Sequence, residues 1–175
     1  MDTLDSIIKN MHTHIISNDI HNLRLCLSQC VNLDFTKYTR FNHLTYTRNL
    51  VYMDNDFELI LLCWQKNQET PIHDHDNQEC LFVVLDGIAD EIFYNYDTTT
   101  GIMHVHSYTQ HQKCNISQID DARLFHKIKV ASNTLLTLHC YFKPIKSCLI
   151  YDDSTGKVTS KILKFNTIDG VDTPV

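Results

Sequence analysis

Apolar residues at the start of the chain recur at intervals of three and four positions, a pattern that predicts helices. The first stripe predicts a helix over residues 3–17 and consists of Leu4, Ile7, Ile8, Met11, Ile15 and Ile16. A second helix is expected from about Ile20 to Cys30, with Ser17 or Asp19 as its candidate N-cap. Residues 1–43 are therefore predicted to form a helical segment.

From residue 44 onward the apolar pattern is that of strands separated by turn-forming residues, such as Asp54–Asp56 and Asp86–Gly87. Many short strands at this spacing are typical of an antiparallel sandwich or barrel. The expected strands are Leu44–Tyr52, Phe57–Trp64, Cys80–Leu85, Ile88–Tyr96, Gly101–Tyr108, Arg123–Val130, Thr134–Phe142, Cys148–Tyr151 and Lys157–Phe165. The prediction is a mainly β chain with short N-terminal helices, a single domain over residues 1–175 in which residues 44–175 form an antiparallel barrel or jelly roll.

Charge and cysteine usage limit the possible partners and setting. A formal net charge of −6, a pI near 5.9 and the lack of a Lys/Arg block argue against nucleic acid or an anionic membrane as partner. Seven cysteines with no CxxC pair, no signal-like segment at the start and no apolar run of ~18 residues indicate a reducing, cytoplasmic setting. Histidine is the unusual component, with 11 residues.

Residues Pro71–His75 place two histidines one residue apart, directly after a turn-rich stretch. Side chains two apart on a strand share a face, so His73 and His75 can bind one metal ion together. The pair, followed by a polar loop, an apolar strand and Gly87, resembles the first metal motif of the cupin barrels. Cupins carry a further histidine on a later strand, and His126 occupies such a position.

Three neutral imidazoles would leave coordination positions open, as in catalytic rather than structural metal sites. Zinc, iron, manganese, nickel and copper all accept imidazole, so the spacing does not identify the metal. The alternative is that these histidines are hydrogen-bonded core residues without a metal.

Two other histidine pairs have the same spacing but a different context. His12 and His14 lie in the first predicted helix, where positions two apart diverge by ~200° and do not share a metal ion. His104 and His106 are expected on a solvent-facing strand. Both pairs are predicted to be surface residues.

The chain resembles cysteine dioxygenase, the thiol dioxygenase branch of the cupins, from about Tyr46 to the C-terminus. The matching stretches are Tyr46–Val51, Cys63–Trp64, Pro71–His75, Cys80, Gly87, His126, Thr137–Tyr141, Pro144 and Cys148. The resemblance implies a ferrous iron, Fe(II), site formed by His73, His75 and His126, whose open face takes O2 and the thiolate and amine of L-cysteine. It also implies that both oxygen atoms pass to sulfur, giving cysteine sulfinic acid, with all four electrons supplied by the substrate.

The resemblance further implies that Cys80 points inward and forms a thioether cross-link with Tyr141, a protein-derived cofactor that fixes the phenol beside the metal. Without the resemblance, core packing is the plain explanation of Cys80. Glu79 is the competing residue, because an inward carboxylate would make a site of three histidines and one glutamate, as in oxalate-type cupins. We expect Glu79 to be exposed, the usual location of a glutamate.

Strand alternation places Thr137, His139 and Tyr141 on one face. The resemblance implies that Tyr141 and His139 bind substrate and take part in catalysis with Cys80, and that Thr137 hydrogen-bonds to His139 and fixes its tautomer. The alternative is a polar face in solvent. If the three side chains are buried, each polar group needs a partner.

Tyr46 and Arg48 are also two apart and are predicted to share a face. The planar fork of arginine suits a carboxylate, so Arg48 is the candidate for binding the α-carboxylate of cysteine, with Tyr46 adding a hydroxyl donor. The alternative is an arginine on an exposed strand. Trp64 and Phe57 are expected in the core.

The predicted function is that of a monomeric iron-dependent cysteine dioxygenase acting on free L-cysteine and O2, in which another divalent metal can replace iron after purification. The alternatives are a dioxygenase for another small thiol, such as 3-mercaptopropionate, and a non-catalytic cupin that binds a metal or a small ligand. Two positions depart from the family pattern. Phe125 stands where a glycine often precedes the third histidine, and Glu79 stands where a neutral residue or histidine is common.

Overall fold

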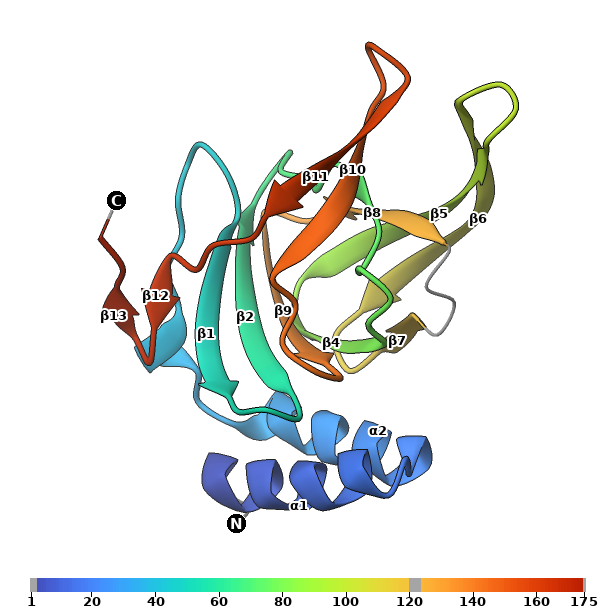
Figure 1. The fold of residues 1–175 in the computed structure, drawn as a ribbon. Coiled ribbons are helices and arrows are strands. Elements are labelled where there is room, and N and C mark those ends of the chain that lie inside the picture. The colour runs from blue at the N-terminus through green and yellow to red at the C-terminus, as the bar shows by residue number, and fades with distance from the viewer. Residues whose placement is uncertain (1–2, 120–123, 175) are drawn as a thin grey trace.

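Two N-terminal helices lie side by side against one face of a β-sheet in the computed structural model, which describes residues 3–119 and 124–174 (Figure 1). Helix α1 (Leu4–Ile16) begins with a capping box between Thr3 and Ser6. Helix α2 (Ile20–Gln29) is capped by Asp19, whose carboxylate accepts the Asn22 backbone N–H. The helix predictions are confirmed, and Asp19 is the cap. Two 3₁₀ turns follow, η1 (Cys30–Asn32) and η2 (Thr36–Tyr38).

The described residues form thirteen strands in two sheets. Their bounds are β1 (Thr47–Met53), β2 (Glu58–Gln65), β3 (Ile72–His73), β4 (Cys80–Asp86), β5 (Ile88–Asp97), β6 (Ile102–Gln112), β7 (Ile116–Ile119), β8 (Phe125–Val130), β9 (Thr134–Tyr141), β10 (Ser147–Asp152), β11 (Lys157–Ile162), β12 (Thr167–Ile168) and β13 (Val171–Asp172). The larger sheet has the order β13-β12-β1-β2-β9-β4-β7 and the smaller β11-β10-β3-β8-β5-β6. Pairing is antiparallel except between β1 and β12.

The two sheets face each other without closing into one hydrogen-bonded ring, so the architecture is an open jelly roll (Figure 1). The mainly β, antiparallel, cupin-type prediction is confirmed, and the barrel takes the form of two stacked sheets. One apolar cluster fills the space between the sheets and includes Phe82, Ile128 and Val130. The two stacked sheets therefore enclose one continuous apolar core.

Both faces of the larger sheet are covered, which explains the uninterrupted apolar runs of β2 and β4. In β2, Leu59 and Leu61 pack against the helices, in a cluster with Leu23. The alternate residues Ile60 and Trp64 point into the space between the sheets. Strand alternation therefore serves two cores at once.

Several elements differ from the expectation. The three strands β7, β12 and β13 were not predicted, because segments of two to four residues carry little periodicity. The strand expected to carry both His73 and His75 is the two-residue β3, which ends at His73. The first strand begins at Thr47, since Leu44 is 79% exposed and precedes the sheet. The strand after Gly101 continues to Gln112, and the last long strand ends at Ile162. Arg123, the expected start of one strand, lies outside the described residues, and β8 begins at Phe125.

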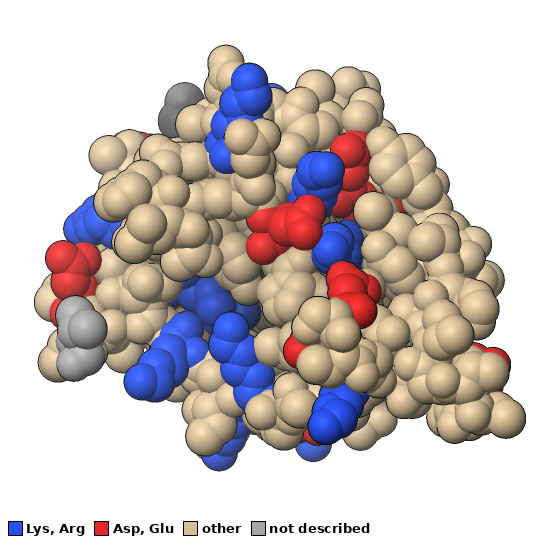
Figure 2. Space-filling model, turned by 90° about the horizontal axis from the view of Figure 1, so that it is seen from above, with Lys and Arg blue, Asp and Glu red and all other residues tan. Residues whose placement is uncertain are grey.

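Neither helix in the described part of the chain combines the length and the apolar character that crossing a bilayer requires. The face opposite the helices carries both basic and acidic side chains. Lys and Arg side chains gather toward the lower left of this view, and Asp and Glu side chains stand between basic ones near its centre (Figure 2).

Candidate metal centre

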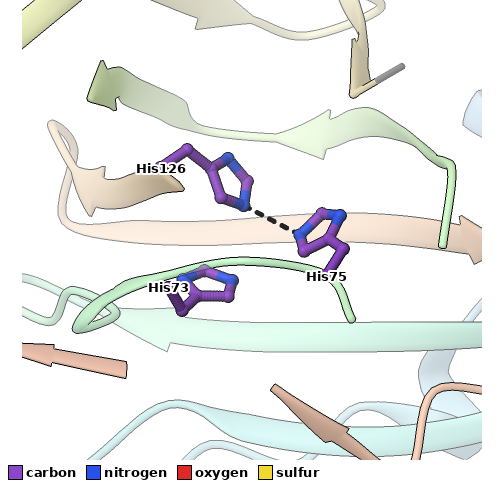
Figure 3. A group of neighbouring side chains, drawn as sticks. All are labelled: His73, His75 and His126. Carbon is purple, nitrogen blue, oxygen red and sulfur yellow. Dashed lines mark hydrogen bonds between the residues drawn. The ribbon is translucent and has the colours of Figure 1, made fainter. Parts of the chain in front are cut away.

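Three histidines, two from the smaller sheet and one from the segment after β3, converge on one point (Figure 3). His73 ends β3 and lies directly opposite His126 on β8, and His75 follows two residues after His73. One ring nitrogen of each lies within 4.8 Å of the others. In β8 the side chains of His126, Ile128 and Val130 are all buried while Lys127 and Lys129 alternate with them, so the third histidine points inward by strand alternation.

The nitrogens of this cluster are arranged for a shared cation. His75 Nε2 and His126 Nε2 face each other at 2.9 Å. His73 Nδ1 donates to the Pro71 carbonyl at 3.0 Å, which leaves its Nε2 free. His75 Nδ1 is buried and has no hydrogen-bond partner among the described residues. Imidazoles with free nitrogens on a common point fit the donor set of a divalent transition metal.

Burial keeps two of the three rings neutral. It lowers the pKa of His73 to about 3, with the neighbouring His126 adding to the effect. Burial also lowers the pKa of His75 well below its ordinary value. Metal binding requires the neutral imidazole, so these shifts favour metal over proton at the site.

Glu91, on β5, is a residue of this centre that the sequence reasoning missed. Its side chain is fully buried, and Oε1 accepts the His126 Nδ1–H at 2.8 Å. Oε2 accepts from His111 Nε2 at 2.8 Å and from Ser117 Oγ at 2.6 Å. Burial raises the pKa of Glu91, but the donors from His111, His126 and Ser117 outweigh it and lower the pKa to about 2. The sequence signal for this residue is its position: strand alternation places Glu91 on the same face as Ala89 and Phe93, and an acidic residue rarely faces the interior without a partner.

Cys80 and Tyr141 are direct neighbours across the β4–β9 pair, and both are buried. Burial raises the pKa of both the Cys80 thiol and the Tyr141 phenol well above their ordinary values. The Tyr141 ring also lies edge-on to His75, with 5.3 Å between ring centroids. Glu79 is exposed, as expected, so its carboxylate lies outside the histidine cluster.

The polar face of β9 is buried between the sheets. His139 Nε2 and Thr137 Oγ1 are 2.9 Å apart, and Trp64 Nε1 donates to the same hydroxyl at 3.0 Å. Since that hydroxyl accepts from Trp64, its own proton is available to His139 Nε2. Phe82 stacks on the His139 ring at 4.9 Å between centroids. The solvent-facing alternative for this strand is therefore wrong.

A small pocket adjoins the histidines and is lined by Tyr46, Arg48, His73, His75, Tyr141 and Cys148 among others. Its cavity volume is about 30 Å³. Arg48 Nε and Nη2 are buried and have no hydrogen-bond partner among the described residues. Buried guanidinium donors without partners are costly, so their presence beside a pocket indicates a site for an anionic group.

The other histidine pairs lie away from this centre. His104 and His106 are exposed on β6, as expected. His12 is 38% exposed at its side chain and contacts Asp54 and Asp56 at the surface of the β1–β2 turn. His14 is partly exposed near Asp19.

Comparison with known proteins identifies the family. The family model described as Cysteine dioxygenase type I matches residues 7–154. The chain belongs to the cysteine dioxygenase type I family. It is 29% identical to cysteine dioxygenase type 1 of Danio rerio, over 99% of this chain and 90% of the relative. It is 30% identical to cysteine dioxygenase type 1 of Homo sapiens, over 81% of this chain and 72% of the relative. Membership of the family makes the chain a thiol dioxygenase.

Solved structures share the fold. A protein from Klebsiella pneumoniae with a double-stranded β-helix domain has a TM-score of 0.50 and 13% identity, over 74% of this chain and 88% of its own. Oxalate decarboxylase of Lactobacillus farciminis has a TM-score of 0.52 and 13% identity, over 67% of this chain and 35% of its own. At these identities the likeness extends to the fold alone.

Proposed function

We propose that this member of the cysteine dioxygenase family oxidises free L-cysteine to cysteine sulfinic acid with O2, using ferrous iron held by His73, His75 and His126. The proposal rests on one observation, that two features lie side by side. Three histidines, of which His75 and His126 are buried and His73 is half-buried, converge beside a pocket in which Arg48 Nε and Nη2 lack hydrogen-bond partners among the described residues. A small amino acid thiol has a group for each site: its thiol and amine for the metal, and its carboxylate for Arg48.

The three histidines hold the metal as neutral donors, which leaves it electrophilic and leaves coordination positions open for a thiolate. Ferrous iron supplies the one-electron chemistry by which O2 reacts with a thiolate. The protein contributes no anionic ligand from Glu79, which is exposed. The exposure of Glu79 therefore supports a dioxygenase site over the four-ligand site of oxalate-type cupins.

Arg48 and Tyr46 bind the substrate carboxylate. The guanidinium offers Nε and Nη2 as a two-donor fork, the geometry that a carboxylate accepts. The Tyr46 ring stacks on Trp64 at 4.4 Å between centroids, which restricts the direction of its hydroxyl. Bound in this way, the carboxylate end fixes the distance of the thiol from the histidines.

Tyr141 lies beside His75 and lines the same pocket, so its phenol contacts the bound substrate. A thioether from Cys80 holds the phenol in this position, supported by their direct pairing across β4 and β9. His139 orients the phenol and the carboxylate, and Thr137 orients His139 through the 2.9 Å hydrogen bond.

A thiol panel tests the substrate. The protein is loaded anaerobically with Fe(II), and O2 uptake is measured with L-cysteine, 3-mercaptopropionate and cysteamine, which lacks the carboxylate. We expect L-cysteine to give the highest kcat/KM and cysteamine to lose the contribution of Arg48. Preference for 3-mercaptopropionate would replace L-cysteine as substrate, and the absence of uptake with every thiol would favour the non-catalytic alternative.

His126→Ala is the matched variant for the metal. Removing one of three ligands is expected to abolish iron retention and O2 uptake together. If the variant kept stoichiometric iron and full activity, the assignment of the metal site would be wrong. The cytoplasmic setting, the monomeric state and small molecules as the only partners remain predictions.

A further inference from the structure

Glu91 forms a buried junction between four strands of the jelly roll. It lies on β5, and its carboxylate contacts His111 of β6, Ser117 of β7 and His126 of β8. All three contacts are between 2.6 and 2.8 Å, and the Glu91 side chain has no exposed surface. A carboxylate removed from water in this way requires such donors, and each oxygen has at least one.

The contact to His126 decides which ring nitrogen faces the other histidines. A carboxylate only accepts hydrogen bonds, so His126 Nδ1 carries the proton that points to Glu91 Oε1. In the neutral ring, Nε2 then carries the lone pair, and it faces His75 Nε2 2.9 Å away (Figure 3). This is the nitrogen that a metal ion between the rings would need.

The three histidines of the cluster are supported differently. His73 Nδ1 donates to a neutral carbonyl, that of Pro71, and His75 Nδ1 has no partner among the described residues. Within the described chain, His126 is the member of the cluster with an anionic partner. A carboxylate behind a ligating histidine fixes the ring and increases its donor strength.

We propose that Glu91 is the positioning residue of the metal site: its carboxylate holds His126 with Nδ1 protonated and Nε2 directed at the metal, while His111 and Ser117 hold the carboxylate. The role rests on the proposed iron site at His73, His75 and His126. His111 and Ser117 both bind Oε2, which leaves Oε1 to His126 and sets the rotation of the carboxylate. The network therefore extends the metal site to the edge strand β6.

Glu91→Gln tests this role, because it keeps the size of the side chain and removes its charge. If the amide oxygen of the glutamine faces His126, the amide NH2 replaces Oε2 and faces His111 and Ser117. Both of these side chains donate to Oε2 in the wild type, so donors would then face donors. We expect the affinity for Fe(II), measured by anaerobic competition with a chromophoric chelator, to fall by about ten- to a hundredfold. In the metal-free full chain, nitrogen NMR of the histidines should show a mixture of His126 tautomers in place of the single Nδ1–H form.

The matched control is Glu58→Gln, which alters another fully buried glutamate whose hydrogen bond goes to the Ile145 backbone. Measured above pH 7, where the Glu58 carboxyl is ionised in the folded chain, this variant should leave Fe(II) affinity and the His126 tautomer unchanged. A folded Glu91→Gln protein that binds Fe(II) as tightly as the wild type would overturn the proposal. An equal loss in the control would also overturn it, since the effect would then be one of core charge.

Ser117→Ala provides a second variant if Glu91→Gln does not fold. It removes one donor to Oε2 and leaves the Glu91–His126 contact possible, so a smaller loss of Fe(II) affinity is expected. No change in affinity or tautomer would contradict the network. If the wild type itself does not bind Fe(II), the proposed function fails, whereas the tautomer comparison in the metal-free chain still decides the role of Glu91.

Discussion

Glu58 tests how burial between the sheets changes the pKa of a carboxyl group. Its side chain has no exposed surface, and Oε1 accepts the Ile145 backbone N–H at 3.2 Å. Oε2 has no hydrogen-bond partner among the described residues. Burial raises the pKa of Glu58 from 4.5 to about 7, although the Ile145 N–H and Arg48 act in the opposite direction.

The size and sign of the effect follow from this pKa. Below pH 4.5 the carboxyl is protonated in both the folded and the unfolded chain, so it contributes no pH dependence. Between pH 4.5 and 7 the unfolded chain releases its proton while the folded chain retains it, and the free energy of unfolding falls. At about 1.4 kcal/mol per pKa unit, the full loss above pH 7 is ~3 kcal/mol.

Glu58→Gln removes this titration. The free energy of unfolding of the metal-free protein is measured in urea from pH 5 to pH 8 for both proteins. We expect the difference, variant minus wild type, to rise by up to ~3 kcal/mol toward alkaline pH. Glu79→Gln, which alters an exposed glutamate, controls for the loss of a carboxyl group at the surface. A Glu58→Gln difference that is constant over this range would refute the reasoning.

Two further predictions concern the pocket and a turn. Arg48→Gln removes buried donors to the proposed substrate carboxylate, and each charge-assisted hydrogen bond contributes about 1.5–3 kcal/mol. In O2-uptake assays KM for L-cysteine should therefore rise by at least about tenfold, with the iron content unchanged. An unchanged KM would show that Arg48 does not bind the substrate. Gly87→Ala should lower the free energy of unfolding by about 1–3 kcal/mol, because Gly87 has φ +85° and a Cβ would collide with the Thr134 carbonyl. Gly101 has φ +72°, but an added Cβ would lie at an ordinary contact distance, 3.9 Å from its nearest neighbours, so an equal loss for Gly101→Ala would show that the collision is unimportant.

Local alternation explains why much of the interior could be predicted from sequence. The shared face of Thr137, His139 and Tyr141 depends only on the strand period, and the structure has all three buried. The inward position of Cys80 and the exposure of Glu79 also agree with the expectation. The shared face of β9 needs no knowledge of which strands pair, whereas the inward position of Cys80 was expected from the family resemblance.

Features that depend on strand register could not be predicted. The contact between Glu91 and His126 requires β5 beside β8, and its contacts to His111 and Ser117 involve β6 and β7. The four-residue β7 that carries Ser117 has too little periodicity to be recognised. Likewise, the opposition of His73 and His126 follows from the pairing of β3 with β8, and the sequence suggested it only through family resemblance.

Isotope labelling of the product is the most direct test of an iron site that directs both atoms of O2 to the sulfur of L-cysteine. The Fe(II)-loaded protein is given L-cysteine under ¹⁸O2, its iron content is determined, and the product is analysed by mass spectrometry. The account predicts cysteine sulfinic acid with both sulfinate oxygens labelled, formed only by protein that retains iron at His73, His75 and His126. Formation of cystine without sulfinate, or a label in only one oxygen, would contradict it.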